Sequence, residues 1–309
     1  MALSPHVTVR IDLGRIRRNV EQIRSMTGVP VMAVIKADAY GLGAERVAAA
    51  IADLVEGFCI FRVAEAIEAQ HFQRTGKQSL ALGPDLDLTA DDYLAQGVRP
   101  AVWSEDRAMA LRRARPILSV DTGMQRFACP ADQIDRVLRA GQCDEAFTHA
   151  TSLHRVDRLL ALVGNRGLKL HAAGSSLLHE PTARLDCVRP GIALYRGAAR
   201  IHARLVDVRK SAGPVGYSRF TASRHGVILA GYSNGLRVGP CIVNGRRSRV
   251  LEVGMQSSFV ETADADGVGD EVVLLGDGLL ESDIAAEWKC SQHEVLTRLC
   301  GAGAREYVQ

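Results

Sequence analysis

The chain has 309 residues, of which 47% are hydrophobic and 24% are charged, and its formal net charge is +3. This balance argues against nucleic acid or a membrane surface as a partner, and no apolar run approaches the roughly 20 residues of a membrane-spanning helix. The seven cysteines are widely spaced without a Cys-x-x-Cys pair, so we expect free, buried thiols. Because the amino-terminal residues hold no apolar signal core, we expect a cytoplasmic protein.

Strand-like and helix-like patterns alternate from the amino terminus onward. Residues 7–11 alternate apolar and polar side chains, as in a half-buried strand, and residues 13–23 have the apolar spacing of an amphipathic helix that ends at Gly28. Residues 29–35, VPVMAVI, are apolar throughout, which is typical of a parallel strand covered on both faces. A helical stretch follows at residues 43–55.

The alternation continues well beyond the middle of the chain. We therefore predict an α/β fold in which residues 1–204 form a parallel (β/α) barrel that binds the cofactor discussed below, with residues 6–12 as a candidate strand outside it. Residues 148–174 leave little room for a full helix between two strands, which predicts a trimmed or irregular barrel.

The pattern changes near residue 205. Short strands separated by Asn-Gly, Gly-Arg and Asp-Gly turns predict a β-rich domain over residues 205–309. Two helices are expected near its end, and Ser291 and Glu294 form a capping-box pattern at the start of the second.

Lys36 follows directly after the apolar run 29–35. In parallel barrels, functional residues gather at the carboxyl ends of the strands. A poorly solvated lysine there has a lowered pKa and can bond to an aldehyde, of which pyridoxal 5'-phosphate (PLP) is the common biological example. The position alone suits equally well a lysine whose stem packs while its amine reaches water.

A wider set of motifs is similar to one enzyme family. The stretch around Lys36, AVIKADAYGLG, closely resembles the PLP-lysine motif of the bacterial alanine racemases. Later stretches match that family in the same order: VDTGMQRFA, THA, LHAAGSS, VRPGIALYRG, VGYSRFTA and GYSNG. The resemblance implies a shortened, divergent fold type III enzyme with PLP as cofactor and a homodimer with shared active sites, in which residues 205–309 contribute to the partner's site. It implies interconversion of L- and D-alanine or of a related small amino acid.

The resemblance also implies two catalytic bases. Lys36 would carry PLP and act on one face of the substrate, and Tyr217 of the partner subunit would act on the opposite face. A free tyrosine has a pKa of about 10, and His149 and Arg189 match the family residues that stabilise its ionised form. Arg189 would also face the pyridine nitrogen of PLP and, because arginine keeps its proton, leave that nitrogen neutral.

Further residues match the family's binding positions. Arg126 would bind the substrate carboxylate or the phenolate oxygen of PLP, the Met255 N–H would reach the carboxylate from the partner subunit, and Tyr232 would line the entrance. Taken singly, Tyr217 and Tyr232 also suit packed aromatic residues. The residues that match phosphate contacts are Tyr40, Ser175, Gly191 and Ile192.

Four positions depart from the family pattern. Ser119 replaces a lysine that many racemases carbamylate, and Gly174 replaces an asparagine near the phosphate. Gln256 replaces an aspartate near the substrate entrance and so removes a negative charge. His293 replaces a phosphate-binding tyrosine in the first turn of a helix, where amide dipoles favour an anion, although an exposed first-turn residue is the alternative. These changes leave both proposed bases in place. They predict a different affinity for substrate or cofactor, another amino acid as substrate, or a weaker activity.

Other functions stay open on the sequence. A PLP-dependent decarboxylase or a specialised racemase of another amino acid would use the same architecture, and a non-catalytic PLP-binding protein would bind the cofactor without α-proton exchange. The sequence contains no P-loop, metal-ligand cluster or Gly-x-Ser-x-Gly elbow, so we expect no metal.

Overall fold

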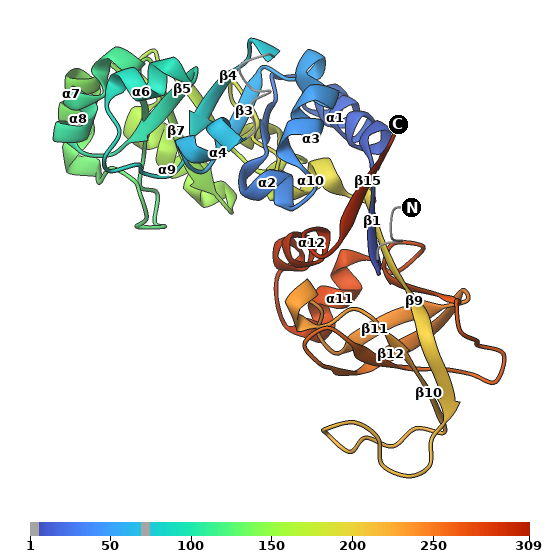
Figure 1. Ribbon diagram of the computed structural model, residues 1–309. Coiled ribbons are helices and arrows are strands. Elements are labelled where there is room, and N and C mark those ends of the chain that lie inside the picture. The colour runs from blue at the N-terminus through green and yellow to red at the C-terminus, as the bar shows by residue number, and fades with distance from the viewer. Residues whose placement is uncertain (1–5, 69–74) are drawn as a thin grey trace. The chain divides into compact units, whose positions relative to one another are not determined.

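The computed structural model of the protein describes residues 6–68 and 75–309. These residues form two compact units, which we call the barrel unit and the sheet unit (Figure 1). The barrel unit comprises residues 16–39 and 43–195, and the sheet unit comprises the described residues up to 15, residues 40–42 and residues 196–309.

Parallel strands form the sheet of the barrel unit, each hydrogen-bonded to the next in chain order. The residues of most of these strands are buried on both faces, as the continuous apolar runs predict. The strands are β2 (Met32–Val34), β3 (Gly57–Ile60), β4 (Gln78–Ala81), β5 (Val98–Val102), β6 (Ile117–Ser119), β7 (Glu145–Ala150) and β8 (Lys169–Ala173).

An irregular segment, residues 186–190, joins the last strand to the first. On its β8 side, the Arg189 N–H donates to the Ala173 carbonyl oxygen at 2.8 Å. On its β2 side, the Met32 N–H donates to the Val188 carbonyl oxygen at 2.9 Å. This segment forms only isolated parallel bridges, yet it completes the ring of backbone hydrogen bonds, so the barrel is closed.

Helices alternate with these strands. The segment 148–174 holds an 11-residue helix, so the expected lack of room was wrong, because only two residues separate the end of β7 from the start of α9. The alternating pattern also predicts a helix after β3, and part of that segment, residues 69–74, lies outside the described residues. The α-helices here are α1 (Leu13–Thr27), α3 (Ala44–Ile51), α4 (Val63–Glu68), α6 (Ala90–Ala95), α7 (Glu105–Ala110), α8 (Ile134–Gly141), α9 (Leu153–Val163) and α10 (Ile192–Tyr195). The segment α2 (Lys36–Tyr40) is a left-handed turn, because its residues from Ala37 onward have positive φ angles. The 3-10 helices are η1 (Ala52–Leu54), η2 (Arg112–Ala114), η3 (Ala131–Gln133), η4 (Ser175–Leu177) and η5 (Pro181–Ala183).

The sheet unit contains an eight-stranded sheet in the order β10-β13-β12-β11-β14-β9-β1-β15. Strand β10 also pairs with β9, so the strands from β10 to β9 close into an antiparallel ring. The strands are β1 (Val7–Asp12), β9 (Ala199–Lys210), β10 (Arg224–Ile228), β11 (Gly239–Val243), β12 (Arg246–Val253), β13 (Ser258–Glu261), β14 (Glu271–Leu275) and β15 (Ala304–Val308).

Strand β1 belongs to this sheet, where it pairs with β9 and β15. The boundary expected near residue 205, between the α/β pattern and the β-rich pattern, falls inside β9, because that strand is continuous from Ala199 to Lys210. Between β11 and β12, Asn244 and Gly245 have φ angles of 48° and 76°, which fits the type I′ hairpin turn that an Asn-Gly pair favours.

The sheet unit ends in two helices, α11 (Glu281–Trp288) and α12 (Gln292–Cys300), and it also holds η6 (Tyr232–Asn234). The Ser291 hydroxyl accepts the Glu294 N–H at 3.2 Å, so the predicted N-cap is present. The reciprocal half of the capping box was wrong, because the Glu294 carboxylate accepts from Arg298 Nε at 2.9 Å and from Arg237 Nη2 at 3.1 Å.

The cysteines are free, and most of them are buried. Within residues 6–68 and 75–309, no helix is both long and apolar enough to cross a membrane.

Candidate active site

Lys36 lies just beyond the carboxyl end of β2 and opens a left-handed turn. Ala37, Asp38 and Ala39 have φ angles of 53°, 55° and 52°, and Tyr40 continues at 59°. Left-handed conformation costs about 1–2 kcal/mol per residue for an L-amino acid with a side chain. Such strain persists only where neighbouring groups fix the backbone, and it gathers at functional sites.

Hydrogen bonds hold this turn in place. The Ala39 N–H donates to the Ile35 carbonyl oxygen at 2.8 Å, and the Ala37 N–H donates to the Glu65 carboxylate at 3.1 Å. The other oxygen of Glu65 accepts the Phe61 N–H at 2.7 Å. Glu65 therefore ties the Lys36 turn to the end of the neighbouring strand β3.

Asp38 connects the same turn to α3. Its carboxylate accepts the Ala44 N–H at 2.7 Å, and its carbonyl oxygen accepts the Gly43 N–H at 2.9 Å. Gly43 has a φ angle of 93°, which glycine adopts without strain. The glycines of the KADAYGLG motif thus let the chain pass from a left-handed turn into a right-handed helix.

The Lys36 amine lies in an environment that favours its neutral form. Burial is the largest cause that lowers the pKa of Lys36, the positive charge of Arg126 lowers it further, and the Glu65 carboxylate raises it in part. The Phe61 ring lies 5.9 Å from Nζ and gives the amine an apolar neighbour. A neutral amine is the form that attacks an aldehyde.

Arg189 projects from the closing segment 186–190. Its Nη2 donates to the Thr148 carbonyl oxygen at 2.5 Å, and its guanidinium lies 4.5 Å from the centre of the Phe147 ring. Its Nε is buried and has no hydrogen-bond partner among the described residues. A buried donor without a partner is costly, so it marks a place for an acceptor from outside the chain.

His149 lies on β7 with its side chain exposed. Desolvation by the protein atoms around its ring, followed by the charges of Arg189 and Lys36, lowers the pKa of His149 to about 4. The imidazole is therefore neutral at pH 7 and acts as a hydrogen-bonding group. Arg126 is exposed as well and makes no hydrogen bond or ion pair with any residue in the described ranges.

Ser175 and the start of α10 form a small polar cradle. The Ser175 hydroxyl oxygen accepts the N–H groups of Gly191 and Ala193 at 2.9 and 3.1 Å. Ile192 opens α10, where N–H groups have no partner within the helix. A Cβ added to Gly174 would have only the Arg189 carbonyl oxygen within 4 Å, at 3.8 Å, so the space beside the cradle is open.

Four further predicted residues lie in the sheet unit, in two pairs. The rings of Tyr40 and His293 have centroids 5.8 Å apart, with Tyr40 buried and His293 exposed. Tyr232 donates its N–H to the Gly254 carbonyl oxygen at 2.9 Å, which places it beside Met255. Tyr232 and Met255 are both exposed, as is Gln256.

Tyr217 is almost fully exposed, since 94% of it is accessible to solvent. It lies in the connection between β9 and β10, which Figure 1 shows extending beyond the strands. A tyrosine with so little cover has no packing role within its own chain, so the alternative of a packed aromatic residue does not hold.

Residues 11–147 match the family model of the alanine racemase N-terminal domain, and residues 198–307 match that of the alanine racemase C-terminal domain. The chain belongs to the alanine racemase family. The alanine racemase of Mannheimia succiniciproducens is 29% identical over 97% of this chain and 99% of its own length. The biosynthetic alanine racemase of Escherichia coli is likewise 29% identical, with the same coverage.

Solved alanine racemase structures share the fold. That of Streptomyces lavendulae has a TM-score of 0.90 at 22% identity and covers 100% of this chain and 98% of its own. That of Bartonella henselae, which has covalently bound pyridoxal phosphate, has a TM-score of 0.87 at 22% identity, with 98% and 99% coverage.

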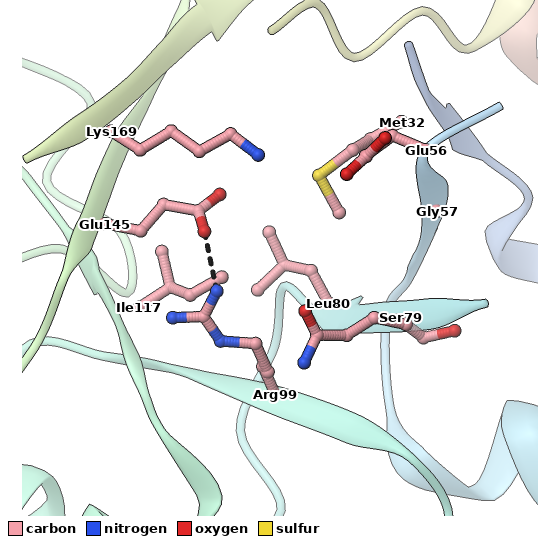
Figure 2. A pocket seen from close by; sticks show the side chains of 10 residues that line it. Met32, Glu56, Gly57, Ser79, Leu80, Arg99, Ile117, Glu145 and Lys169 are labelled. Atoms are coloured by element: carbon pink, nitrogen blue, oxygen red, sulfur yellow. Dashed lines mark hydrogen bonds and ion pairs between the residues drawn. The ribbon is translucent and has the colours of Figure 1, made fainter. Parts of the chain in front are cut away.

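A pocket at the other end of the barrel is separate from this alanine racemase-like site. It is lined by residues at the amino ends of the strands, including Arg99, Glu145 and Lys169 (Figure 2). Arg99 donates to Glu145 at 2.6 Å, as the dashed line in Figure 2 marks. Lys36 lies beyond the carboxyl end of β2, whereas Lys169 is the first residue of β8. The two lysines therefore lie at opposite ends of the same barrel.

Some residues of the candidate site have no clear signal in the sequence. Glu65 and Phe61 flank the end of β3, and Phe147 lies beneath the Arg189 guanidinium. His171 stacks on Phe147 at 5.4 Å and is fully buried. A carboxylate one helical turn after the end of a barrel strand was the only available signal for Glu65, and nothing local marks the aromatic residues.

Proposed function

We propose that this chain is a PLP-dependent racemase that interconverts L- and D-alanine. The observation that carries the proposal is Lys36, a strand-end lysine with a lowered pKa, presented by a strained left-handed turn in a chain of the alanine racemase family. Relatives named alanine racemase match the chain over nearly all of its length, which supports alanine as the substrate.

The residues of the barrel unit suit PLP. Lys36 would hold its aldehyde carbon covalently, and Arg189 has a buried, unpartnered Nε for an acceptor such as the pyridine nitrogen. The Ser175 hydroxyl, the Gly191 backbone and the N–H of Ile192 would face the phosphate, next to the open space at Gly174. Tyr40 and His293 are the remaining proposed phosphate contacts.

Bound PLP would draw electrons from the substrate's α-carbon and so make the α-proton acidic. Arg189 would donate a hydrogen bond without giving up its proton, because an arginine stays charged in proteins. Arg126, the Met255 N–H and Tyr232 would orient the substrate, with Arg126 binding its carboxylate. Arg126 makes no ion pair with a residue in the described ranges, so its charge is available for this purpose.

Inversion requires one base on each face of the α-carbon. Lys36 would take and return the proton on one face, and its lowered pKa makes it a better base near neutral pH. Tyr217 would act on the other face, supported by the charge of Arg189 and a hydrogen bond from neutral His149. Because Tyr217 is almost fully exposed, we propose that it serves the site of a partner subunit in a homodimer.

The test is α-proton exchange in deuterated water. Purified protein with PLP is given L- or D-alanine, and loss of the α-proton and inversion are followed by NMR and chiral chromatography. Exchange with inversion is expected. PLP binding without exchange of alanine or other amino acids would overturn the proposal, and release of carbon dioxide would replace it with a decarboxylase.

A further inference from the structure

The connection that carries Tyr217 has a defined shape. Near its tip, the Val215 N–H donates to the Phe220 carbonyl oxygen at 2.9 Å, and these residues form an antiparallel bridge. The bridge makes residues 216–219 the tip of the connection. The Phe220 ring packs edge-on against Phe259 of β13, with centroids 5.4 Å apart. The base of the tip is therefore anchored on the sheet without any contribution from Tyr217.

A buried carboxylate holds the tip itself. Glu252 lies on β12 and is only 8% exposed. One of its oxygens accepts the Tyr217 N–H at 3.0 Å, and the other accepts the Ser218 N–H at 2.6 Å. Two consecutive amides are thus bound by one side chain from a strand more than thirty positions further along the chain.

Gly216 makes this close approach possible. A Cβ added to Gly216 would lie 2.4 Å from a Glu252 carboxylate oxygen, and Gly216 also has a φ angle of 71°. Any side chain at this position would both clash with the carboxylate and strain the backbone. Because Gly216 has no side chain, the backbone just before Tyr217 can lie in direct contact with the Glu252 carboxylate.

Glu252 remains charged in this setting. Burial raises the pKa of Glu252, but hydrogen bonds from Ser218 and Tyr217 outweigh that effect and leave the pKa below its ordinary value. It forms no ion pair within residues 6–68 and 75–309, and its charge is compensated by the Ser218 side chain and by the N–H groups of Ser218 and Tyr217. Hydrogen bonds from N–H groups to a charged carboxylate are strong, so a buried anion orients the two amides that it accepts.

We propose that Glu252 is the positioning residue of Tyr217: it fixes the backbone on both sides of the tyrosine while the ring stays free to reach a substrate. The inference rests on the proposed function, in which Tyr217 is the second base. Glu252 touches neither substrate nor cofactor in this account. It acts only through the direction in which the tip presents Tyr217.

The test compares Glu252→Gln with Glu261→Gln, a control on neighbouring β13 whose side chain is exposed. Glutamine keeps one acceptor oxygen, so the variant retains one of the two amide bonds and should fold. Hydrogen exchange of the Tyr217 and Ser218 amides should accelerate by about tenfold in Glu252→Gln and remain unchanged in the control. Gly216→Ala, which displaces the tip from the carboxylate, should have the same effect.

Measuring the two enantiomers separately distinguishes a loss of Tyr217 positioning from a loss of folded, PLP-binding protein. In Glu252→Gln, removal of the α-proton of L-alanine, assigned to Tyr217, should fall by about 10- to 100-fold. Exchange of the D-alanine proton with retention, assigned to Lys36, and covalent PLP capture should stay within about twofold. Equal losses for both enantiomers, or unchanged amide exchange, would overturn the inference. If the wild type exchanges neither enantiomer, the proposed function fails, whereas the amide measurement still decides whether Glu252 holds the tip.

Discussion

The Lys36 turn and the Tyr217 tip present their side chains in opposite surroundings. Lys36 follows a buried strand of the barrel unit, beside apolar Phe61 and the charges of Arg126 and Glu65. Tyr217 is 94% exposed at the end of a loop of the sheet unit. In both places, however, a single glutamate accepts two backbone N–H groups: Glu65 accepts one from the Lys36 turn and one from the end of β3, and Glu252 accepts two from the tip.

Under the proposed function, this contrast explains how one chain would supply two different bases. The surroundings of Lys36 tune the chemistry of its amine within the same unit, because burial lowers the pKa of Lys36. Tyr217 is exposed, so the reactivity of its hydroxyl would depend on the site of the partner subunit into which it is proposed to insert. In both cases a carboxylate binds the backbone, so the side chains of Lys36 and Tyr217 make no part of that contact.

The largest expected effect comes from replacing Lys36, the less exposed of the two side chains. Lys36→Ala should abolish covalent capture of PLP and exchange of both enantiomers, because no other lysine among the described residues lies at the carboxyl end of β2. The measurement is borohydride reduction with PLP followed by mass spectrometry of the peptides. Lys169→Ala, at the opposite end of the barrel, should retain the label on Lys36. Labelling of the Lys36→Ala variant at another residue would contradict the assignment.

A smaller effect is expected from Glu65→Gln, which weakens the carboxylate that holds the Lys36 turn. Losing one amide bond costs about 1 kcal/mol, and removing the negative charge should lower the pKa of Lys36 further. The pH dependence of PLP capture should therefore shift its midpoint to lower pH. Glu105→Gln, on an exposed helix start, is the matched control and should leave the midpoint in place. An unchanged midpoint in Glu65→Gln would show that the Glu65 charge does not affect the pKa of Lys36.

The smallest effect concerns the strain of the left-handed turn. Ala37→Gly should stabilise the protein by up to about 1 kcal/mol, because glycine adopts positive φ without the Cβ clash. Ala49→Gly, an exposed position in right-handed α3, should destabilise it by about 0.5–1 kcal/mol. Urea denaturation of the two variants measures the difference. Destabilisation by both substitutions to the same extent would show that the turn stores no strain.

The sequence predicted the features that depend on local pattern. The run 29–35 indicated a buried strand with Lys36 at its end, and the Asn-Gly pair at residue 244 indicated the hairpin between β11 and β12. Gly28 ends α1, as expected from its φ angle of 69°. In each case a few neighbouring residues are sufficient to determine the conformation.

The features that escaped prediction depend on distant partners. Alanine favours a right-handed helix, so the sequence around Ala37 and Ala39 gives no sign of a left-handed turn. The carboxylate that binds Ala37 lies on α4, and the one that binds Tyr217 lies on β12. Barrel closure by residues 186–190 likewise needs pairing with β2, which lies more than 150 residues earlier in the chain. These arrangements follow from tertiary structure, which overrides local preference.

Subunit mixing tests most directly the claim that the two bases come from different chains. Lys36→Ala and Tyr217→Phe variants, each nearly inactive alone, would be unfolded together, refolded as a mixture and assayed for alanine racemisation. Random pairing into dimers should restore about a quarter of the wild-type activity, because each mixed dimer has one site with both bases. A mixture that remains as inactive as its components would contradict the account and place both bases in a single chain.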